Sequence, residues 1–275
     1  MKIVCAGDVG FDHYIAENKT LPGGISYNVA MHARDQFPSG DVIQLVSVLG
    51  NDDMATQLRL NLKQKGVEQH IDTLPGQSPV QDIHLENGIC RFGNYQVGVL
   101  DNYKVSESSR ATIQNSDVLI VPWFDQITAF FESVMHTPSK GLRVVDFADI
   151  GENKDIERIE AWLQKFDIAF FGLLPTDEGF IGEIANLANT HNKLMLVTLA
   201  DHGSIAFNGA VKFQCAARPV STVVDTTGAG DSFATAFLAE YSHSKNIPAA
   251  MHSGAELAAQ TVSRLGSTPG IMGSE

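Results

Sequence analysis

A glycine-rich turn bounded by two aspartates, Asp225-Thr-Thr-Gly-Ala-Gly-Asp231, leads straight into a stretch with helical periodicity. Phe233, Phe237 and Tyr241 follow at intervals of four, which places them along one stripe of a helix. The glycines therefore fall in the first helical turn, where backbone N–H groups have no partner within the helix. These groups, together with the positive end of the helix dipole, predict a binding site for an anion.

Asp231 adds a carboxylate to the same turn. A carboxylate opposes the binding of a phosphate, but it suits the removal of a proton from a hydroxyl that attacks a phosphoryl group. The alternative is an ordinary helix cap with glycines placed for packing, and two glycines between two aspartates exceed what a cap requires. The pattern therefore favours phosphoryl transfer.

The same seven residues resemble the C-terminal signature of the PfkB, or ribokinase-like, family of carbohydrate kinases. The resemblance implies that Asp231 is the catalytic base. The N–H group of Asp231 and those of Gly228, Ala229 and Gly230 then form the anion hole. The implied reaction moves the γ-phosphoryl group of ATP, bound with Mg2+, to a primary hydroxyl of a sugar or sugar derivative.

The composition limits which partners and which cellular compartment we expect for the chain. The 275 residues carry a formal net charge of −13, which argues against nucleic acid or an anionic membrane surface as a partner. Cys5, Cys90 and Cys215 are scattered and odd in number, which favours a reducing compartment over a disulfide framework. No apolar run approaches the roughly 18 residues of a membrane span, and Asp8 comes too early for a signal peptide. We expect a cytoplasmic protein with one kinase domain over residues 1–275.

Apolar runs alternate with amphipathic stretches along most of the chain. The runs predict strands, the stretches predict helices, and their alternation predicts a mainly parallel α/β sheet. The resemblance implies the three-layer form of this fold, which is ribokinase-like. We expect strands at residues 2–6, 42–49, 118–121, 142–147, 168–171, 193–199 and 204–207, and helices at 29–34, 52–66, 128–135, 154–166 and 249–265.

Residues 78–103 break this alternation. Asn87-Gly88 between two half-polar runs is a strong hairpin signal, and such strands lie outside a buried sheet. The resemblance implies a small β lid over the sugar, drawn from about 10–20 and 78–103, with Arg91 and Asn94 as candidate substrate contacts. Solvated hairpin residues would have the same composition. The lid closes alone or pairs with a second lid in a homodimer, and the sequence leaves both open.

Gly23-Gly24, followed by Asn28, resembles the N-terminal signature of the family, and Asp12 matches its sugar-binding aspartate. The glycines allow a ligand to approach the backbone, and Asn28 offers both a donor and an acceptor. Loop Asp and Asn residues more often simply form turns. The resemblance makes Asp12, Gly23, Gly24 and Asn28 the expected sugar-binding residues.

On the nucleotide side, Thr198 and Gly203 match the turn that the family places near the phosphates and ribose. The family usually carries Asn-x-x-Glu where this chain has Thr176-Asp177-Glu178, and the Asn is absent. The resemblance gives Asp177 and Glu178 to the hydration shell of Mg2+, although acids at a helix start also favour its dipole.

The resemblance also implies a monovalent cation, K+, beside the anion hole. The matching residues are Asp225 and Thr227, with the loop of residues 266–270 on the other side.

The resemblance extends to the branch of the family that acts on fructosamines such as fructoselysine. Arg91-Phe-Gly-Asn-Tyr95, Trp123 and Asp146-Phe-Ala-Asp149 carry it. An ammonium and an amino-acid tail need an acidic or aromatic rim, which Asp101, Trp123, Asp125 and Asp149 could provide. Three alternatives remain: a plain-sugar kinase, a nucleoside kinase, and a non-catalytic sugar-binding regulator. The intact Asp231 argues against the regulator.

Overall fold

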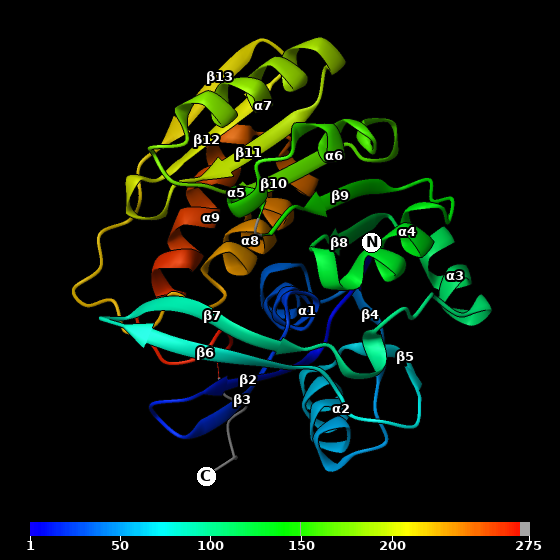
Figure 1. Cartoon of the computed structure of the whole chain (residues 1–275). Helices are drawn as coiled ribbons and strands as arrows, with labels where there is room; N and C mark the ends of the chain where they lie inside the picture. The colour runs from blue at the N-terminus through cyan, green and yellow to red at the C-terminus, as the bar shows by residue number, and fades with distance from the viewer. Residues whose placement is uncertain (149, 270–275) are drawn as a thin grey trace.

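Two β-sheets organise residues 1–148 and 150–269, the part of the chain that this computed structural model describes (Figure 1). The larger sheet has nine strands in the order β13-β12-β11-β10-β9-β8-β1-β4-β5. The seven strands from β11 to β5 are mutually parallel, and β12 and β13 add an antiparallel edge. Their bounds are β1 Lys2–Ala6, β4 Val42–Leu49, β5 Glu68–Thr73, β8 Val118–Pro122, β9 Leu142–Asp146, β10 Ile168–Gly172, β11 Leu194–Thr198, β12 Ser204–Asn208 and β13 Val211–Cys215.

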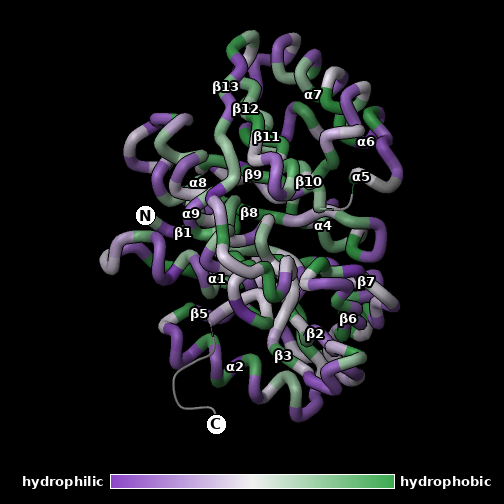
Figure 2. Tube along the Cα trace, turned by 90° about the vertical axis from the view of Figure 1, so that its left-hand side faces the viewer, coloured by the Kyte–Doolittle hydropathy of each residue, from purple (hydrophilic) through white to green (hydrophobic). Residues whose placement is uncertain are grey.

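Helices cover both faces of this sheet, because its strands are apolar on both sides. In β1, Ile3 and Cys5 pack into one hydrophobic cluster, whereas Val4 and Ala6 pack into the other. The first cluster takes in α1 (Ile25–Gln36), α2 (Asp53–Lys65), α8 (Ala229–Ser244) and α9 (Ile247–Thr261). The second takes in α3 (Glu107–Gln114), α4 (Thr128–Met135), α6 (Ile156–Glu160) and α7 (Glu178–His191). Figure 2 shows hydrophobic residues concentrated along the central strands. The predicted three-layer α/β fold with a mostly parallel sheet is confirmed.

The lid is a second sheet of four strands in the order β3-β2-β6-β7. Its strands are β2 (Gly10–Tyr14), β3 (Lys19–Gly23), β6 (Val80–Glu86) and β7 (Ile89–Gln96). The predicted hairpin at Asn87-Gly88 joins β6 to β7, and β6 pairs in parallel with β2. Asp12, which the sequence placed in a loop, lies within β2. Residues 97–103 leave the lid through a short 3-10 turn, Gly98–Leu100.

Most predicted elements agree with the structure to within a residue or two, and a few differ. Asp52 caps α2 by accepting a 2.7 Å hydrogen bond from Ala55 N, as expected. The sequence missed β5 because this strand, which pairs with β4 at the edge of the sheet, is half polar. It also missed α3. The helix expected at 154–166 is broken, with α5 (Ile150–Asn153) before α6 and a 3-10 turn (Leu163–Lys165) after it. The break falls at Trp162, whose ring packs edge-on against Phe131 of α4.

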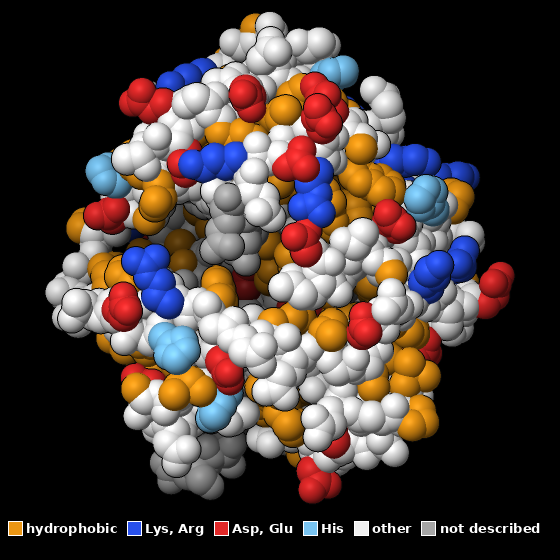
Figure 3. Space-filling view, in the orientation of Figure 1, with side chains coloured by type: hydrophobic (Ala, Val, Ile, Leu, Met, Phe, Trp, Pro, Cys, Tyr) orange, Lys and Arg blue, Asp and Glu red, His pale blue; other side chains and the backbone are white. Residues whose placement is uncertain are grey.

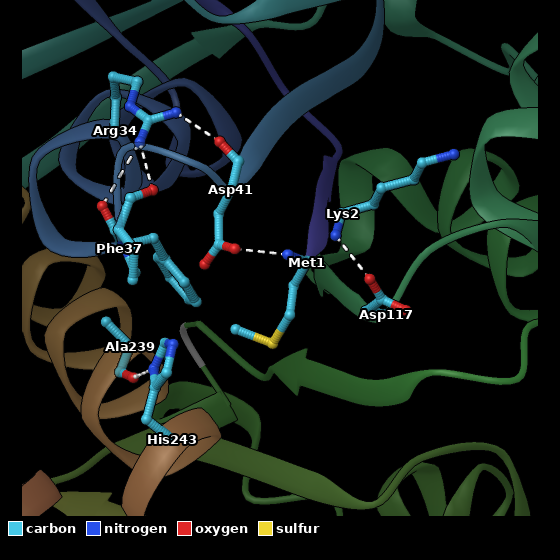
Figure 4. Close-up of polar contacts among 9 residues, drawn as sticks. Met1, Lys2, Arg34, Phe37, Asp41, Asp117, Ala239 and His243 are labelled. Carbon is cyan, nitrogen blue, oxygen red and sulfur yellow. Dashed lines mark hydrogen bonds and ion pairs between the residues drawn. The ribbon is translucent and has the colours of Figure 1, made fainter.

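The edge of the large sheet at the amino ends of its parallel strands is closed by side-chain-to-backbone hydrogen bonds (Figure 4). Arg34 of α1 donates to the carbonyl oxygens of Asp41 at 2.7 Å and Phe37 at 3.4 Å, which holds the loop before β4. The backbone N–H of Lys2 donates to Asp117, just before β8, at 2.7 Å. The polar site described below lies at the opposite edge, at the carboxyl ends, where parallel sheets place their ligands. Within the described residues, no helix combines the length and apolarity needed to span a membrane.

Candidate active site

The predicted anion-binding turn forms the start of α8. Gly228 caps the helix with a φ of 75°, and a Cβ on it would lie 2.5 Å from the Cβ of Ser267. This position therefore requires glycine for both its backbone angle and its neighbour. Gly230 is exposed, and apart from its own helix and chain neighbours no atom of the described residues lies within 4 Å of where its Cβ would be. The turn is thus held firmly on one side and open on the other.

The N–H groups of this turn are only partly satisfied within the protein. Ala229 N donates to Thr226 O at 3.2 Å, and Ser232 N donates to Gly228 O at 3.0 Å. The N–H groups of Gly230 and Asp231 have no such acceptor within residues 1–148 and 150–269. Two open donors at a positive helix end suit the oxygens of a phosphoryl group. Ala229, which the sequence included in the anion hole, uses its N–H to close the turn.

Asp231 is buried and is held by a relay of hydrogen bonds. Asn28 of α1 donates from Nδ2 to Asp231 Oδ2 at 2.7 Å. Ser267 donates from Oγ to Asn28 Oδ1 at 2.7 Å, and the carbonyl oxygen of Ser267 lies 2.9 Å from His32 Nε2. Asn28 was predicted to contact the sugar, and in this structure its amide orients the predicted base. Sequence reasoning missed Ser267 and His32.

Burial raises the pKa of Asp231 well above its ordinary value, and the charge of nearby Asp146 raises it further. The hydrogen bond from Asn28 acts in the opposite direction and lowers this pKa. A carboxylate with a raised pKa is a better proton acceptor, so its environment suits a general base.

Asp12 points from the lid toward the same site. Its side chain is buried, and it makes no hydrogen bond within the described residues. A Cβ on Gly23 would lie 2.3 Å from the Asp12 carboxyl carbon, so the glycine makes room for this carboxylate. Gly24 has a φ of 97° and leads into α1, where Asp8 accepts hydrogen bonds from the N–H groups of Ile25 at 3.0 Å and Ser26 at 3.4 Å. The predicted residues Asp12, Gly23 and Gly24 are therefore brought together.

Asp8 and Asp12 both titrate above their ordinary range. Burial, and then the charges of Asp8 and Asp225, raise the pKa of Asp12 to about 7. Burial raises the pKa of Asp8 to about 6, against the lowering effect of its backbone hydrogen bonds. A cluster of buried acids with raised pKa values is a candidate functional site.

Tyr95, on β7 of the lid, is a site residue that the sequence did not single out. Its hydroxyl is buried without a hydrogen-bond partner among the described residues, and the charges of Asp8 and Asp12 raise its pKa after burial does. Its ring contacts that of Phe124 edge-on at 5.7 Å, which joins the lid to the loop after β8. An unsatisfied buried hydroxyl beside Asp12 is a group that an acceptor could pair with.

Arg91 and Asn94, the two lid residues predicted to contact the substrate, do not point toward the site as Asp12 and Tyr95 do. Arg91 pairs across the ladder with His84 and forms an exposed ion pair with Glu86 at 3.8 Å. Phe92 pairs instead with the buried Ile83, so Arg91 lies on the outer face of the lid, away from Asp12. Asn94 is exposed, next to the bulge in β7. The structure brings neither Arg91 nor Asn94 to Asp12.

Of the four residues expected to form a rim around the acceptor, the structure brings Trp123 and Asp125 together through Arg158. Trp123 is buried between the rings of Phe131 and Phe147, and its Nε1 has no partner among the described residues. Arg158 lies over the Trp123 ring at 4.8 Å and pairs with Asp125 at 2.5 Å. Asp101 is exposed at the end of the 3-10 turn after β7. Asp149 lies outside the described residues.

The face shown in Figure 3 is hollowed at its centre, between the lid and the ends of the central strands, with acidic side-chain atoms visible at depth. A separate cavity of about 390 Å³ lies between residues 218–221 and α9. Glu256, Ala259 and Gln260 line it from one face of α9, and Ser263 lines it just after the helix. The cavity borders the segment that runs into the catalytic turn.

Thr198 and Gly203 lie at the end of β11 and in the turn after it. The Thr198 hydroxyl donates to Phe171 O at 3.3 Å. Gly203 has a φ of 90°, and a Cβ there would lie 2.1 Å from Cys215 O, so only glycine fits. The edge of the sheet therefore fixes the position of both residues. Their contact with a nucleotide stays a prediction.

Asp177 and Glu178 do not form a metal-ligand set. Asp177 pairs with Lys154 at 2.5 Å and accepts from Leu174 N at 2.9 Å, and this ion pair is the main cause of its lowered pKa. Glu178 is exposed in the first turn of α7. The described residues contain no group of three or more His, Cys, Asp or Glu side chains suited to a metal. Neither residue belongs to such a group, and their contact with the hydration shell of Mg2+ stays a prediction.

The Asp225 carboxylate organises the entry to the catalytic turn. Its Oδ1 accepts from the N–H of Thr227 at 2.8 Å and from its hydroxyl at 2.6 Å. Its Oδ2 accepts from Tyr14 Oη at 2.7 Å and from Gly266 N at 2.8 Å. Both oxygens are thus engaged, and the predicted K+ would have to rely on backbone carbonyls. Gly270, at the end of the predicted loop, lies outside the described residues.

The fold and this site define a carbohydrate kinase. The model of the pfkB family carbohydrate kinases matches residues 159–272. The chain is 31% identical over 259 residues to a fructoselysine 6-kinase from Shigella flexneri, covering 93% of this chain and 95% of the relative. It is 27% identical over 272 residues to the fructosamine kinase FrlD of Bacillus subtilis, covering 95% and 90%. The chain belongs to the PfkB family.

Solved structures agree on the fold. Adenosine kinase from Sinorhizobium meliloti superposes with a TM-score of 0.82 at 18% identity, covering 98% of this chain and 96% of the other. Ribokinase from Thermotoga maritima gives 0.75 at 22% identity, covering 98% and 96%. The fold is therefore ribokinase-like, and the chain is a phosphotransferase that acts on a sugar or sugar derivative with ATP.

Proposed function

We propose that this protein transfers the γ-phosphoryl group of ATP to the terminal primary hydroxyl of a fructosamine such as fructoselysine. The observation that carries the chemistry is the buried Asp231 in the same helical turn as two open backbone donors. The acceptor class rests on two relatives named for fructoselysine and fructosamine, which match nearly the whole chain. The aromatic and charged surroundings of Trp123 agree with an acceptor that carries a polar tail.

In the proposed reaction the acceptor oxygen attacks the γ-phosphorus, and the bond from that phosphorus to the bridging oxygen of ADP breaks. ADP leaves with the electron pair, and the acceptor proton passes to Asp231. The transition state of such transfers is loose, so the proton moves late and the attacking oxygen needs little activation. The raised pKa of Asp231 suits a base that accepts this proton.

The backbone stabilises the charge on the transferred group. The N–H groups of Gly230 and Asp231 face the open side of the turn and would donate to the phosphoryl oxygens. Asp12 and Tyr95, from the lid, would position the acceptor hydroxyls with one carboxylate and one phenol. We propose that Mg2+ arrives with ATP and neutralises its phosphates.

The nucleotide would lie along the edge formed by β11, β12 and α9. The cavity between residues 218–221 and α9 has a volume of about 390 Å³ and mixes apolar with polar lining residues, which suits a purine base. Thr198 and Gly203 lie at the same edge. The scattered cysteines favour a reducing compartment, and we propose the cytoplasm as its location.

The experiment is a comparison of kcat/KM for fructoselysine, fructose, ribose and adenosine with ATP and Mg2+. We expect fructoselysine to exceed each alternative by at least tenfold, which corresponds to about 1.4 kcal/mol of transition-state preference. A plain sugar or adenosine that leads by the same factor would overturn the fructosamine assignment and leave the kinase. Asp231→Asn protein serves as the control for a contaminating kinase.

A further inference from the structure

The tip of the lid hairpin is joined to the segment that opens the catalytic turn. Thr226 N donates to Gly88 O at 3.0 Å, and Cys90 N donates to Thr226 Oγ1 at 2.8 Å. Gly88 has a φ of 81°, and a Cβ on it would lie 2.5 Å from Val223 O, so the two segments are in direct contact. Figure 1 shows this tip reaching the chain that leads into α8. We call these contacts of Thr226 with Gly88 and Cys90 the clasp.

A second contact joins the lid to the same segment. Tyr14, at the end of β2, is fully buried and donates to Asp225 Oδ2 at 2.7 Å. Asp225 in turn accepts from the N–H and the hydroxyl of Thr227, directly before Gly228. Strand β2 and the β6–β7 hairpin of the lid therefore hold two consecutive residues, Asp225 and Thr226, at the entry to the anion hole.

The same small sheet carries the acceptor-facing groups. Asp12 lies two residues before Tyr14 on β2, so both side chains project from one face of the strand. Tyr95 lies on β7, the strand that begins at the clasp and ends beside Asp8 and Asp12. The strands of this sheet are hydrogen-bonded to one another. If the sheet moves when an acceptor binds, the movement would therefore reach Thr226 and Asp225.

On its far side the segment meets the nucleotide edge. Val224 N donates to Val262 O, just after α9, at 2.8 Å. Residues 218–221, which line the cavity beside α9, end three positions before Val224. Residues 223–226 are thus bound to the acceptor lid on one side and to the nucleotide edge on the other.

We propose that Thr226 is a positioning residue that couples the two substrate sites: through the clasp, a bound acceptor sets the anion hole for the γ-phosphate. Thermodynamic linkage requires the coupling to be reciprocal, so a bound γ-phosphate must tighten acceptor binding by the same factor. A purely structural brace would contribute to stability and would leave the two affinities independent.

The test measures the Kd of the Mg2+ complex of AMP-PNP, a non-hydrolysable ATP analogue, with and without saturating acceptor. The acceptor is whichever of fructoselysine, fructose, ribose and adenosine the wild-type protein phosphorylates fastest, so the result does not depend on the proposed acceptor class. We expect the acceptor to lower the Kd of AMP-PNP at least about fivefold in the wild type, and to lower that of ADP less.

Three variants separate coupling from folding. Thr226→Val keeps the branched shape but removes the hydroxyl acceptor, and its coupling factor should fall to within about twofold of one. Thr226→Ser keeps the hydroxyl and should retain the coupling. Thr222→Val, at an exposed position of the same segment, should behave as wild type.

Wild-type coupling in Thr226→Val, or no coupling in the wild type itself, would overturn the proposal. Tyr14→Phe provides an independent check if Thr226→Val fails to fold, because it removes the second lid contact. Its coupling factor should also fall, and an unchanged factor in a folded Tyr14→Phe protein would equally overturn the proposal.

Discussion

Asn28 and Asp231, which are 203 positions apart, are joined by a buried 2.7 Å hydrogen bond from Nδ2 to Oδ2. The bond fixes the predicted base against α1 and lowers its pKa against the effect of burial. One residue of the N-terminal signature therefore acts on one of the C-terminal signature, and the two motifs form one site.

Asp231→Asn should abolish most turnover while the protein remains folded. Loss of a general base costs about 10²- to 10⁴-fold in rate, and the Asn side chain can keep its contact with Asn28. The measurement is kcat at saturating substrates, with Glu240→Gln in the same helix as a control that should behave as wild type. If the variant retains half of the wild-type kcat, Asp231 is not the general base.

Asn28→Leu should lower kcat and move the acidic limb of its pH profile to higher pH. The reason is that the hydrogen bond from Asn28 lowers the pKa of Asp231, so its loss raises the pH at which the base is ionised. Ser267→Ala removes the next bond of the relay and should give a smaller shift in the same direction. If kcat falls but the acidic limb stays at the same pH, Asn28 does not act through the pKa of Asp231.

Asp12→Asn should change how stability depends on pH. A raised pKa means that the folded state favours the protonated acid, so its stabilising effect is complete below pH 3.8 and is lost as the pH rises through about 7. From pH about 4 to about 8, wild type should lose a few kcal/mol of unfolding free energy relative to Asp12→Asn, at about 1.4 kcal/mol per unit of pKa shift. Urea denaturation over this range measures the difference, and parallel curves would contradict the prediction.

Tyr95→Phe should raise KM for the acceptor without destabilising the protein. Its hydroxyl is buried without a partner in the described part of the chain, so removing it breaks no bond of the folded protein. A hydrogen bond to the acceptor is worth roughly 0.5–1.5 kcal/mol, or about 2- to 10-fold in KM. Tyr103→Phe is the matched control, because its hydroxyl donates to Asp72 and its loss should lower Tm and leave KM unchanged.

K+ should increase the rate above that in an equal concentration of tetramethylammonium. With both Asp225 oxygens already engaged, the cation would be held by backbone carbonyls near residues 225–227. Such a site discriminates by size, so the large organic cation cannot replace K+. Equal initial rates in the two salts would reject the K+ site.

Much of the fold follows directly from the sequence because buried parallel strands are short apolar runs with clear ends. Strands β1 and β4 have the predicted bounds. The polar strand β5 lacks that signal, since it lies at the edge of the sheet next to β4. The hairpin of the lid was predictable from Asn87-Gly88, but not its parallel pairing with β2, which joins residues about 70 positions apart.

The site was predictable where residues follow one another along the chain. Asp231 and its glycines, Asp12 and Asn28 belong to local motifs. Tyr95 and Ser267 also lie in runs that resemble the family, but those runs gave neither residue its role, which comes from tertiary contacts. His32 gave one usable signal, because it follows Asn28 by four residues on a buried helix face. That residues 1–275 form a single domain stays a prediction.

The relay that holds Asp231 has a consequence for the synthesis of the protein. Ser267 and Asn28 are 239 positions apart, and Gly266 and Tyr14 meet on Asp225 over a similar span. A ribosome adds roughly 5–20 residues per second, so the N-terminal half of this enzyme exists for several seconds before its base can be oriented. A nascent chain can build β1, β4 and the lid early, yet it should have no kinase activity until residue 267 has left the ribosome.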